Sequence, residues 1–401
     1  MRPLAFVAPW FGENIPGGAE AELRELTAHL HSAGVPLEIL TTCVRDFNSD
    51  WSRSFHRPGT EVTSDGMIIR RFRPKKRDRS AFDRVNAKLM KGLPVSREEE
   101  RVFLHEMVGS PELCRYIAGN IERYRLFVYI PYMFGTTYYG MRICPEKSVL
   151  IPCLHDEPYA RLTPLRELFP RAAGAVFNAA PEAELAEELY GFSRSGTRTA
   201  VMGIGMDTDI KAEPEDFRRK FGIYEPFILY AGRKDTGKNV GTLVRCFREY
   251  LLRHDTTLRL VLIGGGELAL PGELVRSGRI ADLGFVGKQD KFNALAAAEL
   301  LCQPSLNESF SLVIMESWLC GRPVLVHEEC PVTRGFVSEC SGGLYFADYF
   351  EFEGCVDYLL SHKDTAAAMG ARGGEYVRSH FDWNVIVKRY KEFFELIGGE
   401  R

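Results

Sequence analysis

The chain has 401 residues, more than one hydrophobic core usually supports, so we expect two domains. Apolar residues make up 45% of the chain and charged residues 26%, which is ordinary for a soluble globular protein. The net charge of −3 gives no reason to propose a nucleic-acid partner. No apolar run approaches the ~20 residues that cross a bilayer, so we expect no membrane span.

The ten cysteines form no C-x-x-C pair. Cys320, Cys330 and Cys340 recur at equal spacing, but no histidine pattern lies nearby to complete a zinc site. We therefore expect reduced thiols, no bound metal and a cytoplasmic location.

The chain begins with the pattern of a βαβ unit. Residues 4–8 are a strand candidate, residues 19–32 carry apolar positions on one helical face, and residues 37–40 form the next apolar run. Gly17 and Gly18 lie at the turn between the first strand and the helix, where they let the backbone approach a ligand. The pair matches neither the dinucleotide fingerprint nor a P-loop, and an ordinary turn is the alternative interpretation.

Residues 59–72 predict a hairpin, and further strands are expected at 126–130, 148–154, 175–178 and 199–202. His155 follows the third of these five elements directly, so we expect it at the carboxyl end of a strand. By itself it is more typical of a hydrogen-bonded loop histidine than of a ligand-binding one.

The segment from Arg70 to Arg101 contains twelve Lys or Arg residues and five acidic ones. One interpretation is a solvated helical excursion. The other is a surface that contacts anionic lipid headgroups or a phosphate-bearing acceptor. The sequence does not decide between them.

Residues 203–226 are polar and irregular, and we interpret them as the link between the domains. They contain an Asp-x-Asp, Asp207 and Asp209, which could suggest a divalent-metal site. Because this pair does not follow an apolar strand, we do not interpret it as one.

A second run of alternating strands and helices begins at residue 227, with strands expected at 227–231, 258–263, 282–286 and 300–303 and helices at 240–253 and 292–298. This alternation predicts a parallel sheet covered by helices on both faces. Residues 381–397 form an amphipathic helix near the end of the chain.

Residues 307–320 read NESFSLVIMESWLC, between an apolar run that ends at Pro304 and another that starts at Val324. The pattern predicts strand, loop, helix, strand, with Glu308 in the loop and Glu316 about two turns into the helix. In a doubly wound sheet such a loop lies where ligands bind. The backbone N–H groups of Phe310, Ser311 and Leu312 would then point at an anion. A solvated amphipathic helix is an equally good interpretation from the spacing alone.

Arg233 and Lys238 follow the first strand of the second domain, in a loop that also contains Gly237. A guanidinium and an ammonium at this edge of the sheet can hold the oxygens of a diphosphate and offset charge on a leaving group.

Taken together, these residues resemble a retaining glycosyltransferase of the GT-B fold, in the large family four. The matching features are Gly17 and Gly18, the Arg-x4-Lys pair, and the Glu-x7-Glu pair, in this order along nearly the whole chain. The resemblance implies two Rossmann-like α/β domains, doubly wound and facing across a cleft. We place the first domain at residues 1–205 and the second at residues 206–380. Helix 381–401 is expected to pack back on the first domain.

The resemblance also implies a role for each residue. Arg233 and Lys238 bind the diphosphate of the donor, Glu316 accepts hydrogen bonds from the ribose, and Glu308 holds hydroxyls of the donor sugar beside the amides of Phe310, Ser311 and Leu312. Val286 lies against the nucleobase, His155 lies near the reacting sugar, and Gly17 and Gly18 close over the phosphates. No metal and no cofactor besides the donor are expected.

One residue departs from the family pattern, which often has glycine where this chain has Ser311. The serine side chain narrows the space for the donor, so the donor preference stays open between GDP-mannose and a UDP-hexose. The expected acceptor is a hydroxyl of a glycan or a lipid-linked saccharide, as in the assembly of a bacterial surface polysaccharide or glycolipid. The alternatives are another GT-B reaction, such as an epimerase or a phosphorylase, and a non-catalytic subunit that binds a nucleotide sugar or glycan.

Overall fold

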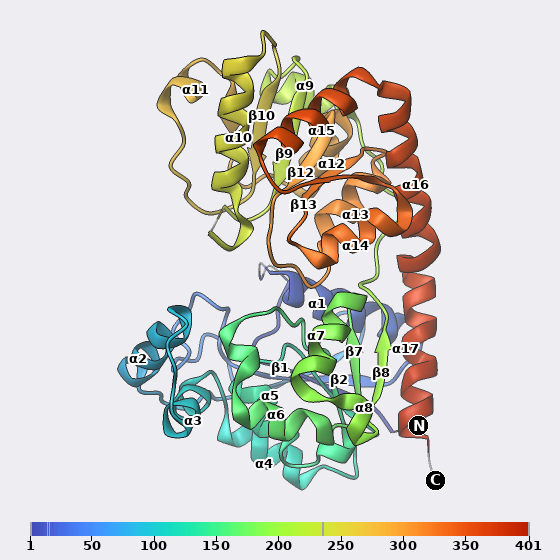
Figure 1. The fold of residues 1–401 in the computed structure, drawn as a ribbon. Coiled ribbons are helices and arrows are strands. Elements are labelled where there is room, and N and C mark those ends of the chain that lie inside the picture. The colour runs from blue at the N-terminus through green and yellow to red at the C-terminus, as the bar shows by residue number, and fades with distance from the viewer. Residues whose placement is uncertain (1, 14, 16, 235, 400–401) are drawn as a thin grey trace. The chain divides into compact units, whose positions relative to one another are not determined.

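A computed structural model describes residues 2–13, 15, 17–234 and 236–399, which form two compact units (Figure 1). The first unit consists of Met1–Gly205 and Trp383–Arg401, and the second consists of Met206–Asp382. The change of unit after Gly205 falls at the residue expected from the sequence. The terminal helix begins at Trp383, two residues later than expected.

The first unit contains an eight-stranded sheet in the order β3-β4-β2-β1-β5-β6-β7-β8. Every neighbouring pair is parallel except β3 and β4, which form the predicted antiparallel hairpin. The strands are β1 Leu4–Ala8, β2 Leu37–Thr42, β3 Gly59–Val62, β4 Ile68–Phe72, β5 Phe127–Tyr129, β6 Ser148–Leu150, β7 Gly174–Phe177 and β8 Arg198–Val201. The α-helices of this unit are α1 Gly18–Ser32, α2 Arg79–Met90, α3 Arg97–Glu106, α4 Pro111–Gly119, α5 Gly135–Met141, α6 Thr163–Leu168, α7 Ala180–Tyr190, α8 Phe192–Ser195 and α17 Trp383–Gly398.

Both faces of this sheet are covered. Ala5 and Val7 of β1 belong to a large apolar core on one face. Because side chains alternate along a strand, Phe6 points to the opposite face, where its ring meets that of Phe394 on α17 at a centroid distance of 6.5 Å. A parallel sheet that is buried on both faces explains why β1 is apolar at all five positions.

Strand β6 is shorter than predicted and ends at Leu150. Pro152 has no N–H to donate, and Cys153 adopts a positive φ of 51°, so the backbone leaves the sheet there. The expectation that His155 directly follows a strand is therefore wrong, because a loop separates the two.

The second unit contains a six-stranded, fully parallel sheet in the order β11-β10-β9-β12-β13-β14. The strands are β9 Phe227–Ala231, β10 Arg259–Ile263, β11 Ile280–Asp282, β12 Leu300–Gln303, β13 Val324–His327 and β14 Gly343–Phe346. The α-helices are α9 Pro214–Phe221, α10 Val240–Arg253, α11 Gly272–Arg276, α12 Lys288–Ala297, α13 Leu312–Leu319, α14 Pro331–Cys340, α15 Tyr349–Ser361 and α16 Lys363–Phe381.

Two expectations for this unit are wrong. The segment interpreted as a linker contains α9, which starts with Pro214 and ends at Gly222 in the left-handed conformation. Strand β11 ends at Asp282 because Gly284 turns the chain with a φ of 63°, so Val286 lies in a loop.

Helix α13, which follows the Glu308 loop, is fixed by close packing against α16. A side chain at Gly373 of α16 would place its Cβ 2.2 Å from the ring of Trp318, so only glycine allows this approach. The Trp318 indole N–H also donates to the carbonyl of Gly342 at 2.8 Å. The helix that begins at Leu312 is therefore held in place by α16 and by the Trp318–Gly342 hydrogen bond.

Candidate functional site

Arg233, Lys238 and Glu308 of the second unit lie in loops that follow β9 and β12, beside a glycine loop that follows β10. These strands are parallel neighbours, so their carboxyl ends share one edge of the sheet. Arg233 and Lys238 follow β9, three glycines follow β10, and Glu308 follows β12. The topology thus brings the predicted cations and carboxylate to the same edge.

The loops after β9 and β10 touch backbone to backbone. A Cβ on Gly264 would lie 2.0 Å from the carbonyl oxygen of Gly232, and the N–H of Lys234 donates to the carbonyl of Gly265 at 2.8 Å. The Tyr230 hydroxyl donates to the carbonyl of Arg233 at 2.6 Å. The main chain at Arg233 is therefore fixed while its side chain is exposed.

Lys238 and Glu308 form an ion pair, with 2.7 Å between Nζ and Oε1. Burial favours a raised pKa for Glu308, but the Lys238 ammonium and hydrogen bonds from Ser305 and Gln303 outweigh it, so the pKa is lowered. The carboxylate thus stays ionised although it is partly buried. Asn239, next to Lys238, donates to the carbonyl of Pro304 at 3.1 Å and so joins the two loops.

Glu316 forms an ion pair with Lys291 of α12. Lys291 is a residue that sequence reasoning missed, because nothing in the motif spacing indicates that α12 crosses α13 at this point. The pair fixes the Glu316 carboxylate near the start of the second turn of α13.

Phe310 is buried, and its ring packs edge-on against Phe336 and Phe381 at 5.3 and 4.9 Å. Its side chain therefore belongs to the core, whereas its predicted role concerns its backbone N–H. Ser311 precedes the helix with a φ of 77°, and Leu312 is the first residue of α13.

Val286 is half-buried, and its neighbour Phe285 is 85% exposed. The loop that carries both is anchored at Asp282, whose carboxylate accepts from Lys234 Nζ at 2.6 Å and from the N–H of Gly284 at 3.0 Å. An apolar surface is thus displayed on a fixed loop, as contact with a nucleobase requires.

Three buried side-chain oxygens of this unit have no hydrogen-bond partner among the described residues, namely Gln303 Oε1, Ser311 Oγ and Thr333 Oγ1. Gln303 donates to Glu308 at 3.4 Å. Unpaired buried polar atoms are costly, and a polar ligand can satisfy them. Together with two cations and two carboxylates, the edge offers groups for both a diphosphate and hydroxyls.

In the first unit, Gly17 and Gly18 lie at the start of α1. A Cβ on Gly17 would lie 1.9 Å from Glu20 Oε2, and the Trp10 indole N–H donates to Glu20 Oε1 at 2.9 Å. Gly17 also has a φ of 141°, a conformation that favours glycine, and Gly18 is exposed with open space around its Cα.

The loop that carries His155 is held by buried carboxylates. Glu182 accepts the N–H of Leu154 at 2.6 Å and that of Asn178 at 2.5 Å, and Glu22 accepts from Asn178 Nδ2 at 2.9 Å. Burial raises the pKa of Glu22 to about 7 and that of Glu182 to about 8, although these hydrogen bonds oppose the change. His155 itself is half-buried.

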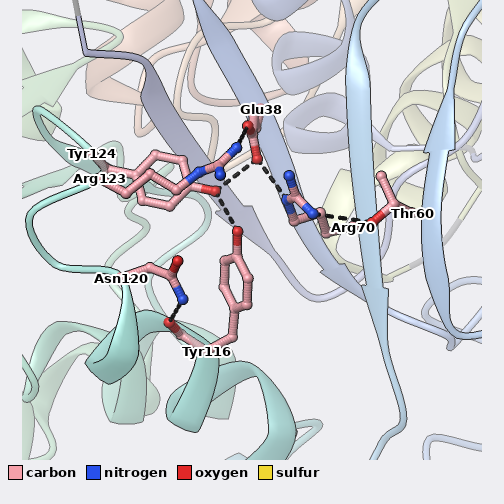
Figure 2. Close-up of polar contacts among 7 residues, drawn as sticks. All are labelled: Glu38, Thr60, Arg70, Tyr116, Asn120, Arg123 and Tyr124. Carbon is pink, nitrogen blue, oxygen red and sulfur yellow. Dashed lines mark hydrogen bonds and ion pairs between the residues drawn. The ribbon is translucent and has the colours of Figure 1, made fainter.

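The basic segment is largely neutralised. Arg70 pairs with the buried Glu38 at 2.6 Å, and Figure 2 shows that Arg123 and Tyr124 reach the same carboxylate. Arg71, Arg73, Lys75 and Arg97 pair with Glu61, Glu112, Glu106 and Glu167, all of which lie outside the segment. These pairs favour the structural interpretation for most of the segment.

Asp207, part of the Asp-x-Asp, pairs with Lys288 at 3.2 Å. Within the described ranges, no group of three or more His, Cys, Asp or Glu side chains could hold a metal ion. Over the same residues, we find no helix with the length and apolar character to cross a membrane.

The family described as glycosyl transferases group 1 matches residues 225–362. A D-inositol 3-phosphate glycosyltransferase of Nocardia farcinica is 28% identical over 245 residues, which cover 57% of this chain and 53% of that protein. One of Pseudarthrobacter chlorophenolicus is 26% identical over 404 residues, covering 92% and 89%. The chain thus spans about half the length of the first of these relatives.

Two solved structures share the fold over the whole chain. Sucrose-phosphate synthase of Thermosynechococcus elongatus has a TM-score of 0.71 at 17% identity and covers 99% of each chain. Anabaena HepE in complex with UDP-glucose has a TM-score of 0.65 at 18% identity, covering 99% of this chain and 100% of that one. The predicted GT-B arrangement of two doubly wound α/β units is confirmed.

The buried carboxylates predict a pH-dependent stability. Between an ordinary carboxyl pKa and the raised values of Glu22 and Glu182, the folded state binds more protons than the unfolded state, so the free energy of unfolding falls as pH rises from about 5 to about 8. Glu22→Gln removes one titrating group. Denaturant unfolding should show the variant gaining ~2 kcal/mol on the wild type across this range.

Glu184→Gln, exposed on the same helix α7 as Glu182, is the matched control and should follow the wild-type curve. Parallel curves for Glu22→Gln and the wild type would contradict the buried titration.

Proposed function

Since residues 225–362 belong to the glycosyl transferases group 1 family and the chain has the GT-B fold, we propose that the protein is a retaining hexosyltransferase. It moves a sugar from a nucleotide-diphospho-sugar to the hydroxyl of a glycan or lipid-linked acceptor. The observation that carries the proposal is the half-buried Lys238–Glu308 pair beside unpaired polar oxygens. A carboxylate that stays ionised at this sheet edge can accept hydrogen bonds from the hydroxyl groups of a sugar.

The proposal assigns one task to each group. Arg233 and Lys238 hold the diphosphate and offset its charge as it leaves. Glu308 accepts hydrogen bonds from hydroxyls of the donor sugar, and Glu316, oriented by Lys291, accepts them from the ribose. Lys238 can serve both the diphosphate and Glu308, because its ammonium has three donors.

In the proposed reaction, the bond between the anomeric carbon and the phosphate oxygen breaks, and a bond to the acceptor oxygen forms on the same face of the sugar. The acceptor proton passes to the departing phosphate. No side-chain nucleophile is needed in this scheme. Arg233 and Lys238 offset the charge on the departing diphosphate, a role that a metal ion has in other enzymes. The proposed reaction is therefore metal-independent.

The donor is proposed to be GDP-mannose or a UDP-hexose. The complex of Anabaena HepE with UDP-glucose supports including the second class. The names of the curated relatives make D-inositol 3-phosphate the first small acceptor to test beside lipid-linked saccharides. Gly17, Gly18 and His155 keep their proposed roles near the phosphates and the reacting sugar.

We propose further that the protein contacts anionic membrane from the cytoplasmic side through the turn between α2 and α3. Met90 is 64% exposed and Leu93 is 51% exposed there, next to the exposed Lys91. Apolar side chains can enter the interface while each nearby cation adds about 1 kcal/mol of attraction. This turn is one part of the basic segment that the ion pairs described above leave available for a lipid surface.

For the transfer reaction, we expect Lys238→Ala and Glu308→Ala to lose at least ~100-fold in activity while their circular dichroism spectra stay native. The assay measures nucleoside diphosphate released from GDP-mannose, UDP-glucose and UDP-galactose with lipid extract or D-inositol 3-phosphate, in the presence of EDTA.

Native rates in either variant would refute the site assignment. Activity that appears only after manganese replaces EDTA would refute the metal-free scheme and direct attention to Asp207. Binding of donor without any turnover would favour the non-catalytic alternative.

For the membrane contact, vesicles with one third anionic phospholipid should sediment the wild-type protein at low salt and less of it at moderate salt. The double variant Met90→Ser, Leu93→Ser should stay in the supernatant. Leu252→Ser, an exposed leucine of α10, is the matched control and should sediment like the wild type. If the wild type does not sediment at either salt concentration, the membrane proposal fails.

A further inference from the structure

We infer that the hydroxyl of Ser311 is a ligand for a hydroxyl of the donor sugar and helps to set which sugar is accepted. This inference rests on the proposed function and deepens it. Two independent features of Ser311 each lower the stability of the ligand-free protein.

The first cost is conformational. Ser311 has φ 77° and ψ 76°, a left-handed conformation in which a side chain is strained and glycine is not. The described residues include only three other non-glycine positions with positive φ, at Cys153, Asn239 and Ser341. Of these, Asn239 is a residue type that tolerates this region.

The second cost is an unmade hydrogen bond. Ser311 is 8% exposed, and its Oγ has no partner in the described part of the chain. A serine before a helix normally accepts an N–H of the first turn, but this one makes no such capping bond. Its backbone lies outside the extended region that capping uses.

The position of Ser311 indicates what would satisfy it. It lies three residues after Glu308 and directly before the first residue of α13, at the sheet edge where the diphospho-sugar is proposed to bind. A hydroxyl both donates and accepts, so it complements a sugar hydroxyl in either direction. The sugar, held also by Glu308, is therefore the part of the donor that Ser311 is expected to touch.

The test separates the hydroxyl from the strain. Ser311→Ala removes the hydroxyl and keeps the strained backbone, whereas Ser311→Gly removes both. Ser341→Gly is the matched control, because Ser341 also has a positive φ, of 51°, but is exposed at the end of α14. Titration calorimetry measures Kd for whichever of GDP-mannose and UDP-glucose the wild type binds, and for its nucleoside diphosphate.

We expect the nucleotide-sugar Kd to rise about three- to tenfold in Ser311→Ala and Ser311→Gly, the effect of one neutral hydrogen bond. The nucleoside diphosphate should bind all variants equally. The Tm of the ligand-free protein should rise by about 2 °C or more in both glycine variants, because each relieves strain. Ser341→Gly should leave both dissociation constants unchanged.

Wild-type affinity of Ser311→Ala for the nucleotide sugar would overturn the inference and leave the proposed function standing. An equal loss for sugar and nucleoside diphosphate would place the hydroxyl at the phosphates and overturn the assignment to the sugar. A wild-type protein that binds neither nucleotide sugar would refute the proposed function itself.

Discussion

The proposed donor site depends on one interaction, the ion pair of Lys238 with Glu308. Each charge would be costly to desolvate alone, and the pair joins the two loops beside the hydrogen bond from Asn239 to Pro304. The pair forms because β9 and β12 are adjacent and parallel, so the loops that follow them meet at one edge. The close contact of the glycine loops after β9 and β10, and the packing of α13 against α16, hold the surrounding main chain still.

Much of the second unit could be predicted from the sequence. Alternating apolar runs and amphipathic segments gave the parallel sheet, and helix α10 has the predicted bounds, 240–253. The resemblance to a known family assigned Lys238 and Glu308 to one donor site, but their direct contact is known only from the structure. The first unit followed the same pattern, including its single antiparallel hairpin.

What could not be predicted depends on contacts between residues distant in sequence. Lys291 reaches Glu316 from another helix, and Glu38 neutralises Arg70 from a neighbouring strand. The strain at Ser311 is invisible until the backbone is known. Helix α9 is different, because Pro214 at its start, acidic then basic turns, and Gly222 at its end were all present in the sequence. That segment was misread because its prolines and glycines resemble a linker.

The central claim is that the second unit binds a nucleoside diphosphate through the edge that carries Lys238, Glu308 and Glu316. The most direct test is the Tm of the wild type and of Glu316→Ala with GDP, UDP, ADP or dTDP. A ligand that binds only the folded state at 100 times its Kd adds about 2.7 kcal/mol of stability. We expect one of these nucleoside diphosphates to raise the wild-type Tm by several degrees and to lose this effect in Glu316→Ala. Equal shifts in both proteins, or none with any nucleotide, would contradict it.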